Sequence, residues 1–257
     1  MKKKCPRRLF YGIILILLLS VLGAYTLPME ERTATIVTNA LAIATAATAV
    51  FGVSCFYRLF WKGKSEFGFS WLLVLIGVIL WLCAEATWAY YDVLVGVDVP
   101  YPSLADVAWT LGYLPIIAGL YRISQDTLAY HNRNHIFAVL VLGAVVGILL
   151  AIFLVPPISN AEVSAAEKFF DVFYIAADII IVTLVVLTAL FFFGSKLLQP
   201  WLVMLLGFLL ICIADIWFVY LNVFGGYGTQ HPVDALYSIS YLLIGFGAFF
   251  YREMAGR

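Results

Sequence analysis

The sequence has few charged residues and few cysteines. Only 12% of its 257 residues are Asp, Glu, Lys or Arg, against about 25% in a typical soluble protein. Its fifteen basic and fifteen acidic residues cancel, so the chain has no excess of positive charge to attract nucleic acid. Its four cysteines lie near a predicted helix end or inside apolar runs, and none forms a C-x-x-C pair. They predict neither a disulfide framework nor a metal or redox motif.

Histidine is equally scarce, which limits the chemistry available inside a membrane. None of the three histidines falls in a predicted span, so the sequence predicts no haem, no zinc site and no other cofactor. The predicted spans contain no lysine for a retinal Schiff base, and glycine-rich nucleotide motifs are missing. Ser103 has no histidine partner and is interpreted as a helix cap. We therefore expect no enzymatic activity.

Apolar residues are abundant: they make up 64% of the sequence, and the mean hydropathy is +1.02. They form runs long enough to cross about 30 Å of hydrocarbon as helices. The predicted fold class is therefore all-α, a polytopic membrane bundle in a single domain over residues 1–257. The eight predicted transmembrane helices are Leu9–Leu27, Ala34–Tyr57, Phe69–Val95, Leu104–Tyr121, Ile136–Val155, Phe169–Phe193, Trp201–Val223 and Ala235–Tyr251. The first follows a basic stretch and is interpreted as a retained signal anchor.

The distribution of positive charge predicts the orientation. If the amino terminus is cytoplasmic, thirteen of the fifteen Lys and Arg residues lie on the cytoplasmic side, and only Arg32 and Lys168 lie outside. This is a strong positive-inside bias. An even number of spans then places both termini in the cytoplasm of a prokaryotic cell, with the lipid bilayer around the helices.

An internal repeat relates residues 9–122 to residues 136–252. At a constant shift along the sequence, Trp71 meets Trp201, Gly77 meets Gly207, Glu85 meets Asp215 and Asp92 meets Asn222; after a gap of two residues, Asp106 meets Asp234 and Tyr113 meets Tyr241. Each half contains four predicted spans, so both halves have the same orientation. The predicted arrangement is two parallel four-helix repeats about an axis along the membrane normal.

Buried acids at matching depth mark the candidate site. A charged side chain in the membrane needs a partner, water or a proton, and no Lys or Arg falls within a predicted span. Glu85 and Asp215 therefore either form a polar cavity between the halves or are neutral acids that hold neighbouring helices together by hydrogen bonds. The candidate ligand-binding residues are Glu85, Trp88, Asp92, Asp106, Tyr113, Asp178, Asp215, Asn222, His231, Asp234 and Tyr241.

Several of these residues also have purely structural interpretations. Asp106, three residues after Ser103, matches a capping box, and Asp234 falls in the first turn of a helix that begins near Pro232. Asp171 lies seven residues before Asp178, on the same face of the sixth predicted helix, and is expected near the membrane interface. An oxygen-rich pocket also suits a divalent cation, but EF-hand spacing is absent, and we predict no metal.

The run W-x-x-A-E-A-T-W-A-Y-Y-D, then G-x-x-x-P-Y-P-S-L-A-D and Tyr113, resembles a family of multi-pass membrane domains. These domains precede PAS, histidine-kinase or diguanylate-cyclase modules in bacterial and archaeal signalling proteins. The resemblance covers residues 81–113 best and implies a sensory input domain. Because no such module follows the last predicted span, we expect a separate cytoplasmic signalling protein as the partner.

Two functions remain open at this stage. The first is a sensory protein that binds an unknown small ligand in a polar external cavity. The second is a small-solute or proton-coupled transporter, because paired acids within duplicated halves also suit transport.

Overall fold

The computed structural model describes residues 7–60, 66–128, 133–228 and 231–255. Lys2, Lys3, Lys4, Cys5 and His131 lie outside these residues. Within them the chain is all-α, with eight helices long and apolar enough to cross a membrane, so the protein is a multi-pass membrane protein. The elements are α1 (Arg7–Thr26), α2 (Glu31–Phe60), α3 (Glu66–Ala89), the π-helical segment η2 (Tyr90–Val95), α4 (Leu104–Leu128), α5 (Arg133–Asn160), α6 (Ala165–Phe191), α7 (Leu198–Phe224) and α8 (Pro232–Ala255).

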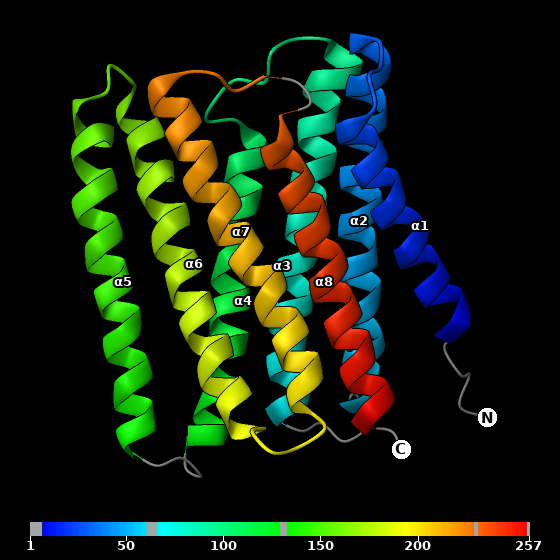
Figure 1. The fold of residues 1–257 in the computed structure, drawn as a ribbon, viewed down its shortest axis with the longest axis vertical. Helices are drawn as coiled ribbons and strands as arrows, with labels where there is room; N and C mark the ends of the chain where they lie inside the picture. The colour runs from blue at the N-terminus through cyan, green and yellow to red at the C-terminus, as the bar shows by residue number, and fades with distance from the viewer. Residues whose placement is uncertain (1–6, 61–65, 129–132, 229–230, 256–257) are drawn as a thin grey trace.

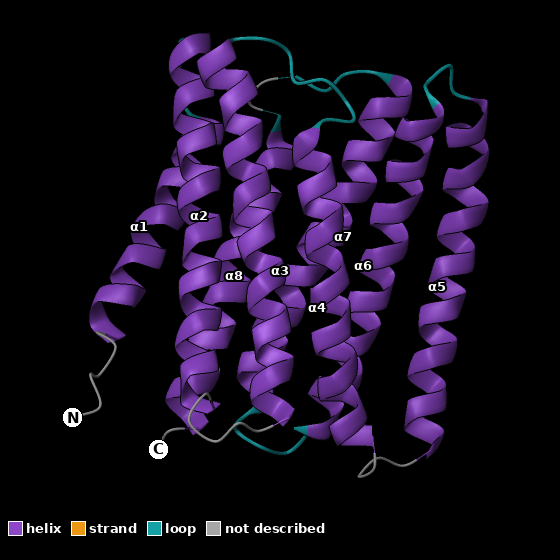
Figure 2. Ribbon diagram, turned by 180° about the vertical axis from the view of Figure 1, so that it is seen from behind, coloured by secondary structure: helices purple, strands orange, loops and turns teal. Residues whose placement is uncertain are grey.

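The helices form a bundle in which α1 and α5 lie at opposite edges (Figures 1 and 2). Between them α2, α3, α4, α6, α7 and α8 form a closed ring, because each of these helices packs against the next and α8 packs against α2. Outside the ring, α1 packs against α2 and α8, and α5 packs against α6. The interior of the ring is therefore shielded from lipid.

The packing of α3 against α4 recurs in the packing of α7 against α8. A Cβ added at Gly77 of α3 would overlap Ile116 and the Gly112 carbonyl of α4. A Cβ added at Gly207 of α7 would meet Ile244 and the Ser240 carbonyl of α8, at the corresponding positions. Small residues allow the backbones of membrane helices to approach closely. The two helix pairs thus use the same contact, while the duplication itself stays a prediction.

The two ends of the bundle differ. We call the end where α1 begins and α8 ends the lower end, and the end that carries segments 96–103 and 225–228 the upper end, as drawn in Figure 1. The sequence also places both termini on one side, but which side of the membrane this is stays a prediction. At the upper end of α3 the chain continues as the π-helix η2 and stops at Gly96, which has a φ of 70°. The apolar periodicity does not predict this π-helical segment.

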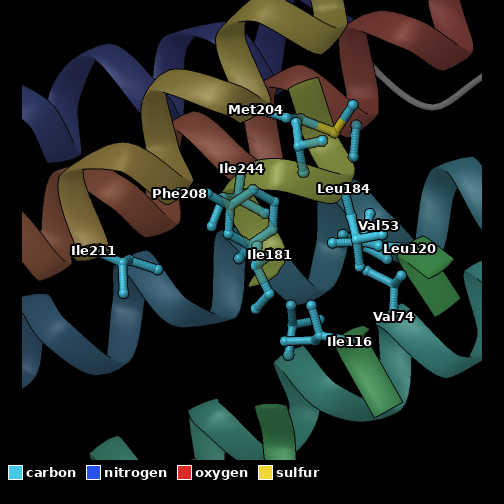
Figure 3. Close-up of a cluster of buried hydrophobic side chains, with 14 of the residues drawn as sticks. Val53, Val74, Ile116, Leu120, Ile181, Leu184, Met204, Phe208, Ile211 and Ile244 are labelled. Atoms are coloured by element: carbon cyan, nitrogen blue, oxygen red, sulfur yellow. The ribbon is translucent and has the colours of Figure 1, made fainter. Parts of the chain in front are cut away.

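The lower half of the ring is filled by apolar side chains. Ile116, Ile181 and Ile244 are at most 1% exposed and come from α4, α6 and α8, with Phe208 of α7 beside them (Figure 3). Nearer the lower end, the rings of Trp71 and Trp201 lie 5.9 Å apart, within a larger aromatic cluster. This dry core closes the interior of the ring from below.

Candidate functional site

A cavity of about 380 Å³ lies inside the ring in its upper half. Ligand pockets in proteins generally have volumes of roughly 300–1,000 Å³, so the cavity has room for a small molecule. Its lining includes six acidic side chains, Glu85, Asp92, Asp98, Asp106, Asp215 and Asp234. Its aromatic lining residues are Tyr25, Trp81, Trp88, Tyr101, Trp109, Tyr113, Tyr174, Phe218, Tyr227, Tyr237 and Tyr241. Both predicted halves contribute to the wall.

Glu85 lies on α3 at the floor of the cavity and is 8% exposed. It lies ten residues before the end of η2, about 15 Å along the helix axis at 1.5 Å per residue. Tyr241 of α8 donates a hydrogen bond of 2.7 Å to its Oε1. The side chain of Trp109 of α4 is a further hydrogen-bond partner. The carboxyl group is therefore bonded to both halves of the ring.

Asp215 occupies the corresponding place on α7 and is 6% exposed. Its Oδ1 accepts a hydrogen bond of 2.5 Å from Tyr237 of α8, and its Oδ2 lies 3.0 Å from the hydroxyl of Tyr113 of α4. The Tyr113 hydroxyl also lies 2.9 Å from Oδ1 of Asp178, and the carboxyl groups of Asp178 and Asp215 are near enough to interact with each other. Asp215, unlike Glu85, is thus part of a pair of carboxyl groups.

Hydrogen bonds from tyrosines cross between the two halves. Tyr241 of the second half bonds Glu85 of the first, and Tyr113 of the first half bonds Asp215 of the second. The crossing is reciprocal, as expected if the halves are related by an axis through the cavity. Any movement of one half against the other therefore changes the hydrogen bonding of both acids.

Above the floor, amide and carboxyl side chains pair across neighbouring helices. Asn39 of α2 donates a hydrogen bond of 2.7 Å to Asp92 of η2, and Asn222 of α7 lies 3.3 Å from Asp171 of α6. Each pair joins one amide to one carboxyl group. In the first half the amide is on α2 and the acid on η2, whereas in the second half the acid is on α6 and the amide on α7. Asp171 is fully buried and also bonds Tyr101 at 2.6 Å, while its place near the membrane interface stays a prediction. The loop 96–103 folds over α6 and covers it.

Asp106 combines a structural role with a place in the wall. Its Oδ2 accepts hydrogen bonds from the backbone and the hydroxyl of Ser103, at 2.7 and 2.9 Å. The Ser103 hydroxyl in turn accepts from the Ala105 backbone at 3.1 Å, as an N-cap does. The other carboxyl oxygen of Asp106 lies 2.9 Å from the Tyr174 hydroxyl of α6. The cap therefore also fixes α4 against α6.

The mouth of the cavity contains Tyr101 and Tyr227, which lie outside the membrane spans. Burial, followed by the neighbouring Asp171, raises the pKa of the Tyr101 phenol well above its ordinary value. Burial and Asp234 do the same to the pKa of Tyr227, whose hydroxyl lies 3.0 Å from Asp234. Both phenols therefore remain protonated, and each donates its hydrogen to the neighbouring acid.

In the described part of the chain, the ion pairs are Arg122 with Glu66 and Arg252 with Glu253. Both pairs lie at the lower end, and the described lining of the cavity contains no Lys, Arg or His. The acids of the cavity are thus hydrogen-bonded but are not neutralised by protein cations. Nor do the described residues bring three His, Cys, Asp or Glu side chains together in a way that could hold a metal ion.

The structure places all but two of the predicted site residues in the cavity wall. One exception is Asp178, which lies behind Tyr113 and Asp215. The other is His231, which packs against the ring of Trp217 at 5.1 Å and accepts a hydrogen bond from the Val233 backbone.

Sequence reasoning missed other parts of the wall. Asn39 was detectable as an isolated amide in an apolar span, and Tyr237 as the residue aligned with Trp109. Tyr25 and Tyr227 gave no such signal, because their places in the wall depend on how α1 and the segment 225–228 pack against the ring.

No protein-family model, no curated protein and no solved structure matches the chain. The resemblance to sensory membrane domains therefore stays a prediction. A fold alone does not fix a function, so the function must be argued from the cavity.

Proposed function

We propose that this protein is a membrane-embedded receptor that binds a small ligand in the cavity and signals to a separate cytoplasmic protein. The observation that carries the proposal is the cavity itself: it has a suitable volume, both halves line it, and its buried acids have no cationic partner in the described lining. Polar groups buried in a membrane are costly. Acids used only for packing do not need an open space in front of them.

The signal would travel through the hydrogen bonds that cross between the halves. A ligand that contacts Glu85 from the cavity draws the carboxyl group away from Tyr241, which is bonded to its Oε1. Since Tyr241 belongs to α8, loss of this bond changes the position of α8 against α3. The helix α8 runs from the cavity to the lower end, which charge distribution predicts to be cytoplasmic. A partner at that end can therefore detect occupancy.

The same substitution made at two positions of α7 tests the binding site. Ile211 lines the cavity and is 4% exposed, whereas Ile213 faces outward and is 50% exposed. Ile211→Trp should fill the cavity, and Ile213→Trp should leave it open. The full chain in lipid nanodiscs is heated with three probes of one shape and different charge: phenethylammonium, 2-phenylethanol and phenylacetate. Binding to the folded state raises Tm.

At least one probe should raise the Tm of the unchanged protein and of Ile213→Trp, and none should raise the Tm of Ile211→Trp. Hydrogen exchange along α8 should change with the same probe, because the receptor hypothesis requires the signal to leave the cavity. If no probe raises Tm, or if Ile211→Trp responds like the unchanged protein, the binding site is wrong. Binding that leaves the exchange of α8 unchanged would contradict the signalling step.

Transport is the second candidate, and the buried pair Asp178 and Asp215 favours it, because carboxyl pairs at mid-depth suit proton coupling. The apolar core below the cavity argues against an open path, since Ile116, Ile181 and Ile244 fill it. Proteoliposomes loaded with a pH-sensitive dye decide between the two. Probe-driven proton flux that Glu85→Gln and Asp215→Asn abolish would replace the receptor proposal with transport.

A further inference from the structure

The aromatic side chains of the cavity are arranged as a continuous wall. The rings of Trp109 and Trp88 lie 5.8 Å apart, and Trp88 is followed by Tyr227 at 6.4 Å. Phe218 lies 5.2 Å from Tyr227, and Tyr101 lies 5.3 Å from Phe218. The wall therefore joins α4, α3, α7 and both upper segments, and it stands above the acids of the floor.

The part of this wall beside Glu85 has two components that favour positive charge. Trp88 follows Glu85 by three residues on α3, so the two side chains lie on one face of the helix. Trp109 is a hydrogen-bond partner of Glu85 and contacts Trp88. Aromatic faces carry negative charge density and attract ammonium groups within about 6 Å of the ring centre. A carboxylate beside two indole rings of the same cavity wall is therefore a favourable site for an organic cation.

Glu85 suits this role better than Asp215. Both oxygens of Asp215 are bonded to tyrosines, and Asp178 lies directly behind it. The tyrosine contact of Glu85 uses only Oε1, and each carboxylate oxygen can accept more than one hydrogen bond. Glu85 therefore retains acceptor capacity on the side that faces the cavity.

Other ligand classes fit less well. An anion would meet six acids and no basic side chain in the described lining. A neutral ligand would leave Glu85 without a charged partner in a low-dielectric site. A bare metal ion would need at least three clustered ligands, which the described residues do not provide, and it would leave most of the volume and the aromatic wall unused.

We propose that the cavity binds a small organic cation, an amine or a quaternary ammonium with an apolar body, whose charged group lies beside Glu85 against the rings of Trp88 and Trp109. The inference rests on the proposed receptor function and names its class of ligand. The acids at the mouth, Asp98 and Asp234, would attract such a cation before it enters.

The test uses titration calorimetry of the full chain in nanodiscs, with phenethylammonium and its neutral isostere 2-phenylethanol. Phenethylammonium should bind at least tenfold more tightly than 2-phenylethanol. Glu85→Gln should weaken phenethylammonium binding at least tenfold and leave 2-phenylethanol unchanged. As a matched control, Glu162→Gln removes an exposed acid from the loop 161–164 at the same end, and it should leave both affinities unchanged.

A second pair of variants tests the aromatic contact without altering charge. Trp88→Leu should weaken phenethylammonium binding about threefold, and Trp217→Leu, outside the lining, should not. Equal affinity for phenethylammonium and 2-phenylethanol would overturn the proposal that the ligand is a cation. So would tighter binding of 2-phenylethanol or phenylacetate to a site that Ile211→Trp blocks. Either result would leave the receptor proposal standing. Failure of all three probes to bind would overturn both.

Discussion

The two halves meet along two seams, and the seams differ. Where α2 meets α8, the backbones are in direct contact, because a Cβ added at Gly52 would overlap the carbonyl of Gly245. In the upper part of the contact between α4 and α6, polar side chains lie between the helices: Tyr113 bonds Asp178 and Tyr174 bonds Asp106, each at 2.9 Å. The first seam is dry and has no room to move, while the second is held by hydrogen bonds that can be exchanged.

The difference assigns separate roles to the two seams. Close glycine packing fixes α2 and α8 as one unit, so a signal cannot come from their separation. A polar seam can change its hydrogen-bond partners at little cost, because other partners lie nearby. We therefore expect ligand-dependent movement at the contact of α4 with α6, and we expect α2 and α8 to move as one unit when Tyr241 leaves Glu85.

The largest effect should come from adding a methyl group where the backbones of α2 and α8 are in contact. Gly52→Ala forces a methyl group against backbone atoms that cannot rotate away, and it should lower the free energy of unfolding by about 3 kcal/mol. Gly12→Ala in α1 is the control, because a Cβ there meets nothing within 4 Å. Reversible unfolding in mixed micelles, followed by tryptophan fluorescence, measures both. Equal stability of the two variants would show that α2 and α8 are not in such close contact.

A smaller effect is expected at the contact of α4 with α6, where the number of available hydrogens limits the hydrogen bonds that can form. The single phenolic hydrogen of Tyr113 cannot serve both Asp178 and Asp215, yet its oxygen lies within 3.0 Å of both. One of the two carboxyl groups must therefore supply a hydrogen. Asp178→Asn, whose amide can also donate, should change the free energy of unfolding by less than about 1 kcal/mol, and Asp178→Leu should lower it by about 2 kcal/mol.

Infrared spectroscopy examines the same hydrogen directly. The unchanged protein should show the C=O band of a protonated carboxyl group at neutral pH. That band should be lost in Asp178→Asn and retained in Asp178→Glu, which keeps a carboxyl group at the site. A band that Asp178→Asn leaves intact would place the proton elsewhere and remove the distinction between the two acid centres.

The fold was predictable from the sequence to the extent that lipid imposes it. Apolar runs of fixed length specify the spans, and the cost of burying charge makes Glu85 and Asp215 conspicuous. Which helices are neighbours is not encoded in such runs, because all of their faces are apolar. The shift that aligns Glu85 with Asp215 was the one signal that placed both acids at a common centre.

The missed features depend on contacts distant in the sequence. Asp171 lies six residues after Ala165, the first residue of α6, and Tyr101, the loop residue that bonds it, is 70 positions away. Asn39 pairs with Asp92, which is 53 positions away. A polar pair of this kind becomes recognisable once the packing of α2 against η2 is known, and no local pattern supplies that packing.

The smallest expected effect concerns the starts of α4 and α8, which the same comparison of halves brings together. Ser103 caps α4 through its hydroxyl, whereas Nδ1 of His231 accepts a hydrogen bond from the Val233 backbone at the start of α8, at 3.2 Å. Burial lowers the pKa of the His231 imidazole below its ordinary value of 6.5. The neutral ring is the acceptor, so its contribution is present above pH 6.5 and is lost as the pH falls through the lowered pKa.

Removing each cap should therefore give different pH profiles. Ser103→Ala should lower the free energy of unfolding by about 1 kcal/mol at every pH, because a hydroxyl does not titrate in this range. His231→Ala should lower it by about 0.5 kcal/mol at pH 7 and by less at pH 5, because protonation of the ring removes the acceptor as the pH falls. Unfolding measured at both pH values separates the two. Asp234 and Tyr227 are the titratable neighbours of His231, and Asp234→Asn should keep the pH dependence if it belongs to the imidazole. A difference between pH 7 and pH 5 that disappears in Asp234→Asn and persists in His231→Ala would assign it to the carboxyl group instead.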